Sequence, residues 1–145
     1  MCKLLAVNHG CYVYMGSRSQ ERGDAALQKM IGEDANCSGK VEVVRVDVSD
    51  PASINACATV VAEKLGGDKL YALVNNAGTT ESVGEGCTRE QMIATNVGGV
   101  MHMTNAFVPL IDPSCGRIVN LGSGGGPSFV NKLPTEQEKA FWSSD

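Results

Sequence analysis

Apolar and polar positions follow two different spacings along this chain, and the spacing changes several times. Four short apolar runs predict β-strands over residues 11–15, 41–46, 70–75 and 117–121. Between these runs, apolar residues recur every three to four positions, which predicts helices that bury one face. The predicted order alternates helix and strand and ends in a polar tail from residue 127. This alternation indicates an α/β fold in which right-handed crossovers join parallel strands.

Capping residues place the ends of several predicted helices. Gly10 fits a left-handed stop after an opening helix. Asp50 followed by Pro51 marks a helix start, because an N-cap carboxylate precedes proline at the first helical position. Thr88 and Gln91 have the spacing of a capping box at the start of a long helix.

Composition and charge narrow the class of protein. The chain has 145 residues, the size of one domain, and a net charge of −4 without a basic patch, which argues against nucleic acid. No run approaches the ~18 apolar residues of a membrane span, and no signal peptide is evident. Six scattered cysteines without a C-x-x-C pair fit a reducing compartment, so a cytoplasmic location is expected. His9 and His102 are isolated, so no metal site is expected.

The most informative stretch is L-Y-A-L-V-N-N-A-G at residues 70–78. Its uncharged apolar part is typical of a strand buried on both faces, as in a parallel sheet. A polar turn beginning with Asn75 then follows at the carboxyl end, where open α/β sheets bind their ligands. Asp47–Val48 and Ser123 also directly follow predicted strands.

Together these residues strongly resemble the short-chain dehydrogenase/reductase family. Four signals stand in the family's order: Asp47–Val48, N-N-A-G at 75–78, Asn96 in the long helix, and Ser123. The resemblance implies an incomplete Rossmann-like parallel sheet with flanking helices, forming one partial dinucleotide-binding domain over residues 1–145. It also implies an oxidoreductase that transfers hydride from a nicotinamide cofactor to a small-molecule carbonyl.

The resemblance assigns cofactor contacts after the first two predicted strands. Family members that use NAD usually carry an acidic residue after the first of them, whereas this chain has Gly16, Ser17 and Arg18. A guanidinium pairs with a 2′-phosphate, so NADP (as NADPH) is favoured over NAD. The alternative for Arg18 is a solvated turn residue. Asp47 is expected to accept from the adenine amino group with Val48 beside the ring, or else to cap its own turn.

Further cofactor contacts fall in the turn after the third strand. Asn75 corresponds to a family residue near the cofactor's ribose, and Asn76 is expected to brace neighbouring strands. Ala77 and Gly78 keep the surface small, so that backbone can approach a ligand.

Asn96 and Ser123 correspond to catalytic residues of the family. The matching asparagine loosens its helix and holds a water in the proton relay, and Gly98–Gly99 would make that distortion cheaper. The alternative for Asn96 is an exposed or side-chain-bonded residue. The matching serine hydrogen-bonds the substrate carbonyl and polarises it for hydride attack.

Two parts of the family's pattern are absent from these residues. The family's proton donor is a tyrosine with a lysine four positions later. The only tyrosines here are Tyr12, Tyr14 and Tyr71, and none has that spacing. The glycine-rich T-G-x-x-x-G-x-G turn that holds the pyrophosphate is absent as well. We therefore expect a fragment, with the glycine-rich turn before Met1 and the catalytic tyrosine and lysine after the last residue.

Two segments resemble the monomeric carbonyl reductase subgroup. Residues 16–23 are similar to its turn, and residues 132–142 are similar to the start of a helical insertion, with Phe141 and Trp142 as anchors. Membership of this subgroup would favour a monomer.

Three hypotheses for function stay open. The first is a fragment, inactive alone, of an NADP-dependent carbonyl reductase. The second is a non-catalytic short protein, either a pseudoenzyme or an interaction module, that retains the sheet scaffold. The third and weakest is an unrelated flavodoxin-like nucleotide-binding domain. Without the family's first, central strand, the two halves of the sheet must close up or expose edges. We therefore expect marginal stability, with no cooperative thermal transition above ~45 °C.

Overall fold

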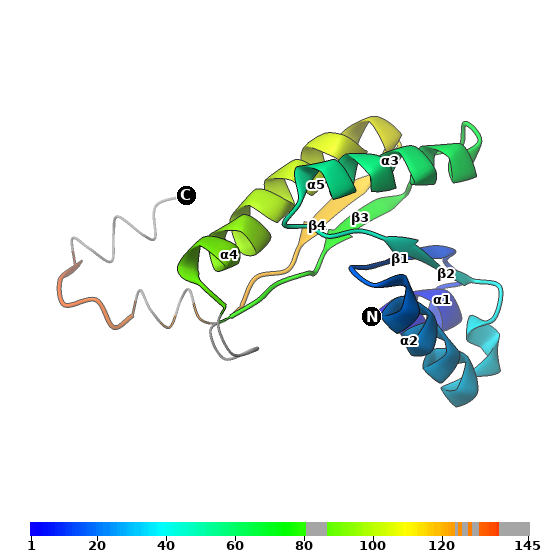
Figure 1. Cartoon of the computed structure of the whole chain (residues 1–145), viewed down its shortest axis with the longest axis horizontal. Coiled ribbons are helices and arrows are strands. Elements are labelled where there is room, and N and C mark those ends of the chain that lie inside the picture. Colours follow the sequence, from blue (N-terminus) through cyan, green and yellow to red (C-terminus); the bar gives the residue numbers. More distant parts are fainter. Residues whose placement is uncertain (81–86, 124, 126–127, 129–130, 137–145) are drawn as a thin grey trace.

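The computed structural model describes residues 1–80, 87–123, 125, 128 and 131–136. Helices and strands alternate along the chain as predicted (Figure 1). The strands are β1 (Val13–Ser17), β2 (Val41–Arg45), β3 (Ala72–Asn75) and β4 (Arg117–Asn120). The α-helices are α1 (Cys2–Asn8), α2 (Gln20–Glu33), α3 (Pro51–Leu65), α4 (Arg89–Ile93) and α5 (Val100–Phe107). Two 3-10 turns, η1 (Ala35–Cys37) and η3 (Val108–Leu110), and the π-helical η2 (Ala94–Gly99) complete the order. Gly124, Gly126 and the expected anchors Phe141 and Trp142 lie outside the described residues.

The strands form two parallel pairs. β1 pairs with β2 in a register that sets Val13 opposite Val41, and β3 pairs with β4 in a register that sets Ala72 opposite Arg117. In the described part of the chain, the two pairs are not hydrogen-bonded to each other. Closure and exposed edges were the two expected outcomes. In these residues the pairs do not close into one sheet, so β1 and β3 each have one edge without a strand partner.

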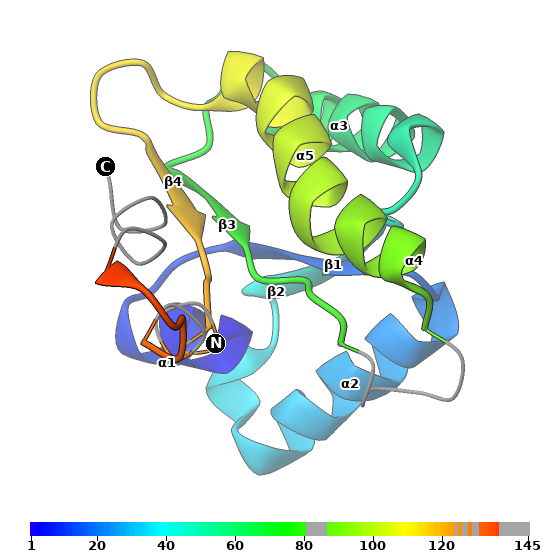
Figure 2. The same ribbon diagram turned by 90° about the vertical axis from the view of Figure 1, so that its left-hand side faces the viewer.

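Helices cover two sides of this arrangement. Figures 1 and 2 place α3, α4 and α5 on one side of the strands and α1 and α2 on the other. The second layer packs against β1 and β2. There a Cβ at Gly23 of α2 would collide with Cγ1 of Val43, so glycine permits the close approach. All of β4 is exposed and Tyr71, just before β3, is 62% exposed. The expectation that residues 70–74 are buried on both faces is therefore wrong, because α1 and α2 do not extend the second layer over β3 and β4.

One hydrophobic core joins the two strand pairs. Val44 of β2 and Leu73 of β3 both belong to it, and the helices contribute Ile54 and Val61 of α3 and Phe107 of α5. Ile54 and Val61 are among the largest fully buried side chains. Burial of such side chains contributes about 1.5–3 kcal/mol each. The core therefore joins β2 to β3, and with them the two strand pairs, despite the divided sheet.

Capping explains most of the helix boundaries. Gly10 has φ of 66° and Gly66 has φ of 57°, so both stops use the left-handed region. The Asp50 side chain caps α3, as predicted. The Cys11 N–H donates to the Leu5 carbonyl at 3.0 Å, which completes the end of α1. The first strand therefore begins two residues later than position 11, where it was predicted.

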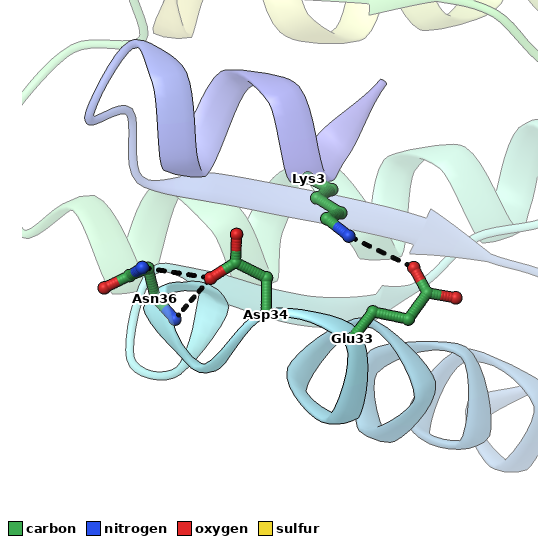
Figure 3. A network of polar contacts seen from close by, with 4 residues as sticks. All are labelled: Lys3, Glu33, Asp34 and Asn36. Carbon is green, nitrogen blue, oxygen red and sulfur yellow. Dashed lines mark hydrogen bonds and ion pairs between the residues drawn. The ribbon is translucent and has the colours of Figure 1, made fainter.

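Polar contacts fix the N-terminal layer. Lys3 Nζ of α1 lies 3.2 Å from Glu33 Oε2 at the end of α2 (Figure 3). In the same view Asp34 Oδ1 accepts from the backbone and side-chain nitrogens of Asn36, both at 3.0 Å. The first contact is an exposed ion pair and contributes little, whereas the second caps η1.

The turn between η3 and β4 contains Asp112, a carboxylate whose pKa is strongly lowered. Asp112 Oδ1 accepts from the Ser114 hydroxyl at 2.6 Å, from its N–H at 2.7 Å and from the Cys115 N–H at 3.1 Å. These bonds lower the pKa of Asp112 from 3.8 to about 2. Since the pKa falls on folding, the stabilisation is complete above about pH 5 and is lost as pH falls through 3.8 toward 2.

Asp112→Asn keeps an acceptor but removes the titration. We expect the stability difference between wild type and variant to be constant above about pH 5 and to shrink between about pH 5 and pH 2. Urea unfolding at several pH values measures it. A difference that stays constant through that window would show that Asp112 does not titrate as described.

Candidate cofactor-binding edge

The predicted site residues follow the carboxyl ends of the four strands. Arg18 follows β1, Asp47 follows β2 after one intervening residue, and the N-N-A-G turn begins at the last residue of β3. Ser123 comes three residues after the end of β4. Because each pair is parallel, each of these ends lies at the same edge as its partner's end. The chain therefore gathers its polar strand-end residues at the carboxyl edges of the two pairs.

Arg18 and Asp47 lie in the same part of this edge. Both line a groove of about 620 Å³ that runs along β2 and α3. Asp47 Oδ1 accepts from the Ser49 hydroxyl at 2.6 Å and from the Ser49 N–H at 2.9 Å. The Ser49 hydroxyl is the main cause of a lowered Asp47 pKa, and the positive charge of Arg18 adds to it. Asp47 therefore caps its turn with one oxygen, and Oδ2 has no hydrogen-bond partner among the described residues.

Val48 contacts the long helix. A Cβ at Gly99, the last residue of η2, would lie 2.7 Å from the Val48 carbonyl oxygen. No side chain fits at that distance without movement, so glycine is required for this approach. Gly99 thus serves packing, in addition to easing the distortion expected at Asn96, and its contact fixes the helix against the turn that follows β2.

Asn75 is a structural brace in this edge. It is 8% exposed, and its Nδ2 donates to Asn120 Oδ1 at 2.8 Å and to Thr104 Oγ1 at 3.3 Å. These bonds join the carboxyl ends of β3 and β4 to α5. The bracing role expected for Asn76 therefore belongs to Asn75. Asn75, the last residue of β3, is buried, whereas Asn76 is exposed.

Asn96 clamps the turn after β3. Its Oδ1 accepts from the Thr79 N–H at 2.9 Å, and its Nδ2 donates to the Thr79 carbonyl at 2.8 Å. Ala77 and Gly78 are exposed, and a Cβ at Gly78 would lie 3.5 Å from Asn96 Oδ1. Asn96 itself lies in the π-helical η2, so the predicted local distortion of the helix is present. Both polar atoms of the Asn96 side chain bond to the Thr79 backbone. This agrees with the alternative in which Asn96 is a side-chain-bonded residue.

Ser123 is exposed beyond the end of β4, and its Oγ accepts from the Gly125 N–H at 3.1 Å. The Asn75–Asn120 register places β4 beside β3 at this end. Asn120, Thr104 and Thr79 are the site residues that sequence reasoning missed. Asn120 could have been found, since it ends its strand as Asn75 does. The others emerge only from contacts between distant segments.

The donor set of this edge fits an adenine nucleotide with an extra phosphate. An arginine without an ion-pair partner among the described residues faces the groove beside a carboxylate oxygen that can accept from an amino group. The described residues include no group of three or more His, Cys, Asp and Glu that could hold a metal. Within the same residues, no helix has the length and apolar character needed to cross a membrane.

Parallel strands, crossover helices and a polar carboxyl edge define a Rossmann-like α/β protein. The sequence model of the short chain dehydrogenase family matches residues 1–134, so this chain belongs to that family.

Named relatives agree with this assignment. Over 96 residues the chain is 35% identical to "Estradiol 17-beta-dehydrogenase 2" of Mus musculus, a match over 63% of this chain and 25% of that protein. The structure is similar to the menthone neomenthol reductase of Mentha piperita, with a TM-score of 0.79 and 27% identity over 99% of this chain and 62% of that one. It is also similar to a metagenomic short-chain oxidoreductase in complex with NADP, with a TM-score of 0.66 and 25% identity over 98% of this chain and 61% of that one. The chain thus spans about a quarter of the first relative and about three fifths of the two structures.

Proposed function

We propose that this chain supplies the adenine-side wall and the carbonyl-orienting serine of an NADP-dependent carbonyl reductase, and that it is inactive alone. The observation that carries the NADP preference is Arg18 after β1, in the groove beside Asp47, where an acidic residue would suit NAD. Carbonyl reduction is supported by the family and by a neighbour that is a reductase by name.

Each site residue then has a defined part. Arg18 would pair with the 2′-phosphate, Asp47 Oδ2 would accept from the adenine amino group, and Val48 would lie beside the ring. Asn75 would border the ribose while its amide nitrogen holds the strands, and the backbone at Ala77 and Gly78 would approach the ligand.

The catalytic part of the proposal concerns Asn96 and Ser123. Ser123 would donate its hydroxyl to the carbonyl oxygen, where negative charge develops during reduction. Asn96 would keep η2 distorted and the turn at Thr79 in place, which positions the backbone that holds a water in the proton relay. NADPH, when bound, would supply the hydride. No Y-x-x-x-K occurs in these 145 residues, so we expect no proton donor for turnover from them.

Arg18→Glu tests the cofactor preference. We expect wild type to bind 2′,5′-ADP roughly tenfold more tightly than 5′-AMP, since a hydrogen bond to a charged group contributes about 1.5–3 kcal/mol before solvent screening. The variant should lose that preference, because a carboxylate repels the phosphate. Affinities measured by NMR titration give the ratio. An unchanged ratio in Arg18→Glu would contradict the assignment.

We expect NADPH itself to bind more weakly than the low-micromolar range, because the glycine-rich phosphate turn is absent from this sequence.

A second candidate is a non-catalytic protein, a pseudoenzyme or interaction module, that keeps the sheet scaffold. The absence of Y-x-x-x-K from the sequence favours it. Reading the coding DNA on both sides separates the two candidates. An in-frame glycine-rich turn upstream and Y-x-x-x-K downstream would support the reductase, whereas transcript-supported start and stop codons at these ends would support the second candidate.

A further inference from the structure

The outer edge of β2 has no strand partner in the described part of the chain, where β2 pairs only with β1. At the end of this pair the Val46 N–H donates to the Ser17 carbonyl at 2.9 Å. A parallel ladder uses every second residue of a strand, so the even-numbered residues of β2 turn their backbone groups toward β1. The backbone N–H and C=O groups that point outward therefore belong to Val41, Val43 and Arg45.

The groove of about 620 Å³ follows this edge. Its strand wall includes four consecutive residues, 42–45. Successive side chains of a strand point to opposite faces, so one groove reaches all four only along the edge of the strand. The other wall is one flank of α3, with Ser53, Ala56, Val60 and Lys64 at helical spacing. From Ser53 to Lys64 a helix rises about 16 Å, which is also the length of a five-residue strand.

The two faces of β2 would present different chemistry to an added strand. Val44 packs in the core beside α3, whereas Val43 faces α2, where a Cβ at Gly23 would collide with it. Arg45 shares the face of Val43 by alternation. The Arg45 side chain is exposed and forms no hydrogen bond or ion pair among the described residues. On the α3 face, Glu42 is already held in an ion pair. The uncommitted charge along this edge is therefore positive and lies on the α2 face.

We propose that β2 and α3 form a docking groove for an extended segment of a partner protein, which adds to β2 as an antiparallel strand. Antiparallel pairing is slightly more stable per residue than parallel pairing. In such strand addition, main-chain hydrogen bonds give affinity and alternate side chains give specificity. The residues of the segment that face α3 are apolar, and a carboxylate lies opposite Arg45, because opposite charges on neighbouring strands attract. This inference does not depend on the proposed reductase function.

A second copy of this chain fits the edge less well. When β2 pairs antiparallel with its own copy about a two-fold axis normal to the sheet, residues of the same face oppose one another. Within β2, Arg45 then meets Val41, Val43 or another Arg45, and no carboxylate. The charge of this edge therefore favours a partner of different sequence.

Two peptides test the groove: acetyl-Glu-Val-Thr-Val-Thr-amide, and the same peptide with Lys in place of Glu. In the antiparallel pairing both Val side chains face α3, and the first residue lies opposite Arg45. We expect NMR titration of the full chain, in TMAO to favour the folded state, to give saturable amide shifts over Val41–Arg45 and at Ala56 and Val60. The Glu peptide should bind roughly fivefold more tightly than the Lys peptide, and Arg45→Glu should reverse that preference.

Matched controls separate strand addition from other binding. Val60→Glu should weaken binding of the Glu peptide roughly tenfold, because it places a charge in the apolar wall. Thr59→Glu should leave binding unchanged, because Thr59 is an exposed neighbour on α3 that does not line the groove. N-methylation of the central Thr of the peptide should abolish binding, since its N–H points at the Val43 carbonyl. N-methylation of the Val that follows should not, since that N–H points away from β2.

Three results would overturn the inference. The first is a wild-type chain without saturable shifts along β2, or with shifts that survive N-methylation of the central Thr. The second is equal affinity for the Glu and Lys peptides, which would exclude an acidic segment. The third is a set of shifts over Val41–Arg45 that depends on protein concentration in the absence of peptide, which would show that a second copy occupies the edge.

Discussion

Asn75→Asp is expected to destabilise the fold by about 3–5 kcal/mol at pH 7, because it leaves a buried, uncompensated charge. The substitution preserves shape but replaces the donating Nδ2 with an acceptor. That acceptor would face Asn120 Oδ1, which now accepts from Asn75 at 2.8 Å. Urea unfolding of the full chain, in sulfate or TMAO to raise the starting stability, measures the loss.

Asn76→Asp is the matched control for this change, since Asn76 is the exposed neighbour. A surface substitution of this kind should stay within about 0.5 kcal/mol of wild type. The loss in Asn75→Asp should also shrink in acid, because burial raises the pKa of the introduced carboxyl and its protonated form can donate to Asn120. Equal losses in the two variants would show that Asn75 does not brace the strands.

Gly99→Ala is expected to cost about 1–3 kcal/mol, the range for overpacking a well-packed site. The added methyl would lie 2.7 Å from the Val48 carbonyl oxygen, and backbone atoms cannot move away as a flexible side chain can. Either η2 or the turn after β2 must shift. Denaturant unfolding gives the cost, and the amide resonance of Val48 reports the local shift.

Gly98→Ala distinguishes this steric effect from helix propensity. A Cβ at Gly98 would lie no closer than 3.8 Å to the Ile93 carbonyl, which is ordinary contact. Alanine at an unobstructed helical position is favoured over glycine by up to about 1 kcal/mol. Gly98→Ala should therefore be neutral or stabilising. Similar losses from the two substitutions would mean that the π-helical backbone, rather than contact with Val48, determines the cost.

The sequence was sufficient for the order of elements because strong local signals mark it. Asp50, Gly10 and the capping box of Thr88 and Gln91 each act within a few residues of their own position. The grouping of Asp47, Asn75 and Ser123 at carboxyl ends also follows from strand order alone. These predictions needed no knowledge of which segments pack together.

Contacts between distant segments set the limit of what the sequence could predict. Nothing local shows that Asn75, rather than Asn76, points inward, since the choice depends on the register with Asn120. Exposure of β4 could not be read from its apolar sequence, because apolar residues are buried only where another element covers them. The division into two strand pairs likewise depends on tertiary pairing, so closure and exposed edges were equally compatible with the pattern.

Mapping 2′,5′-ADP onto the chain by amide chemical shifts tests the central claim, that the carboxyl edge of β1 and β2 binds the phosphorylated adenosine. We predict saturable shifts concentrated at Arg18, Asp47 and Val48. The turn at Gly116, which precedes the start of β4 and so lies at the opposite end of that strand, should not respond. Shifts of equal size at both ends of the strands, or no saturable shift at Arg18 and Asp47, would contradict the account.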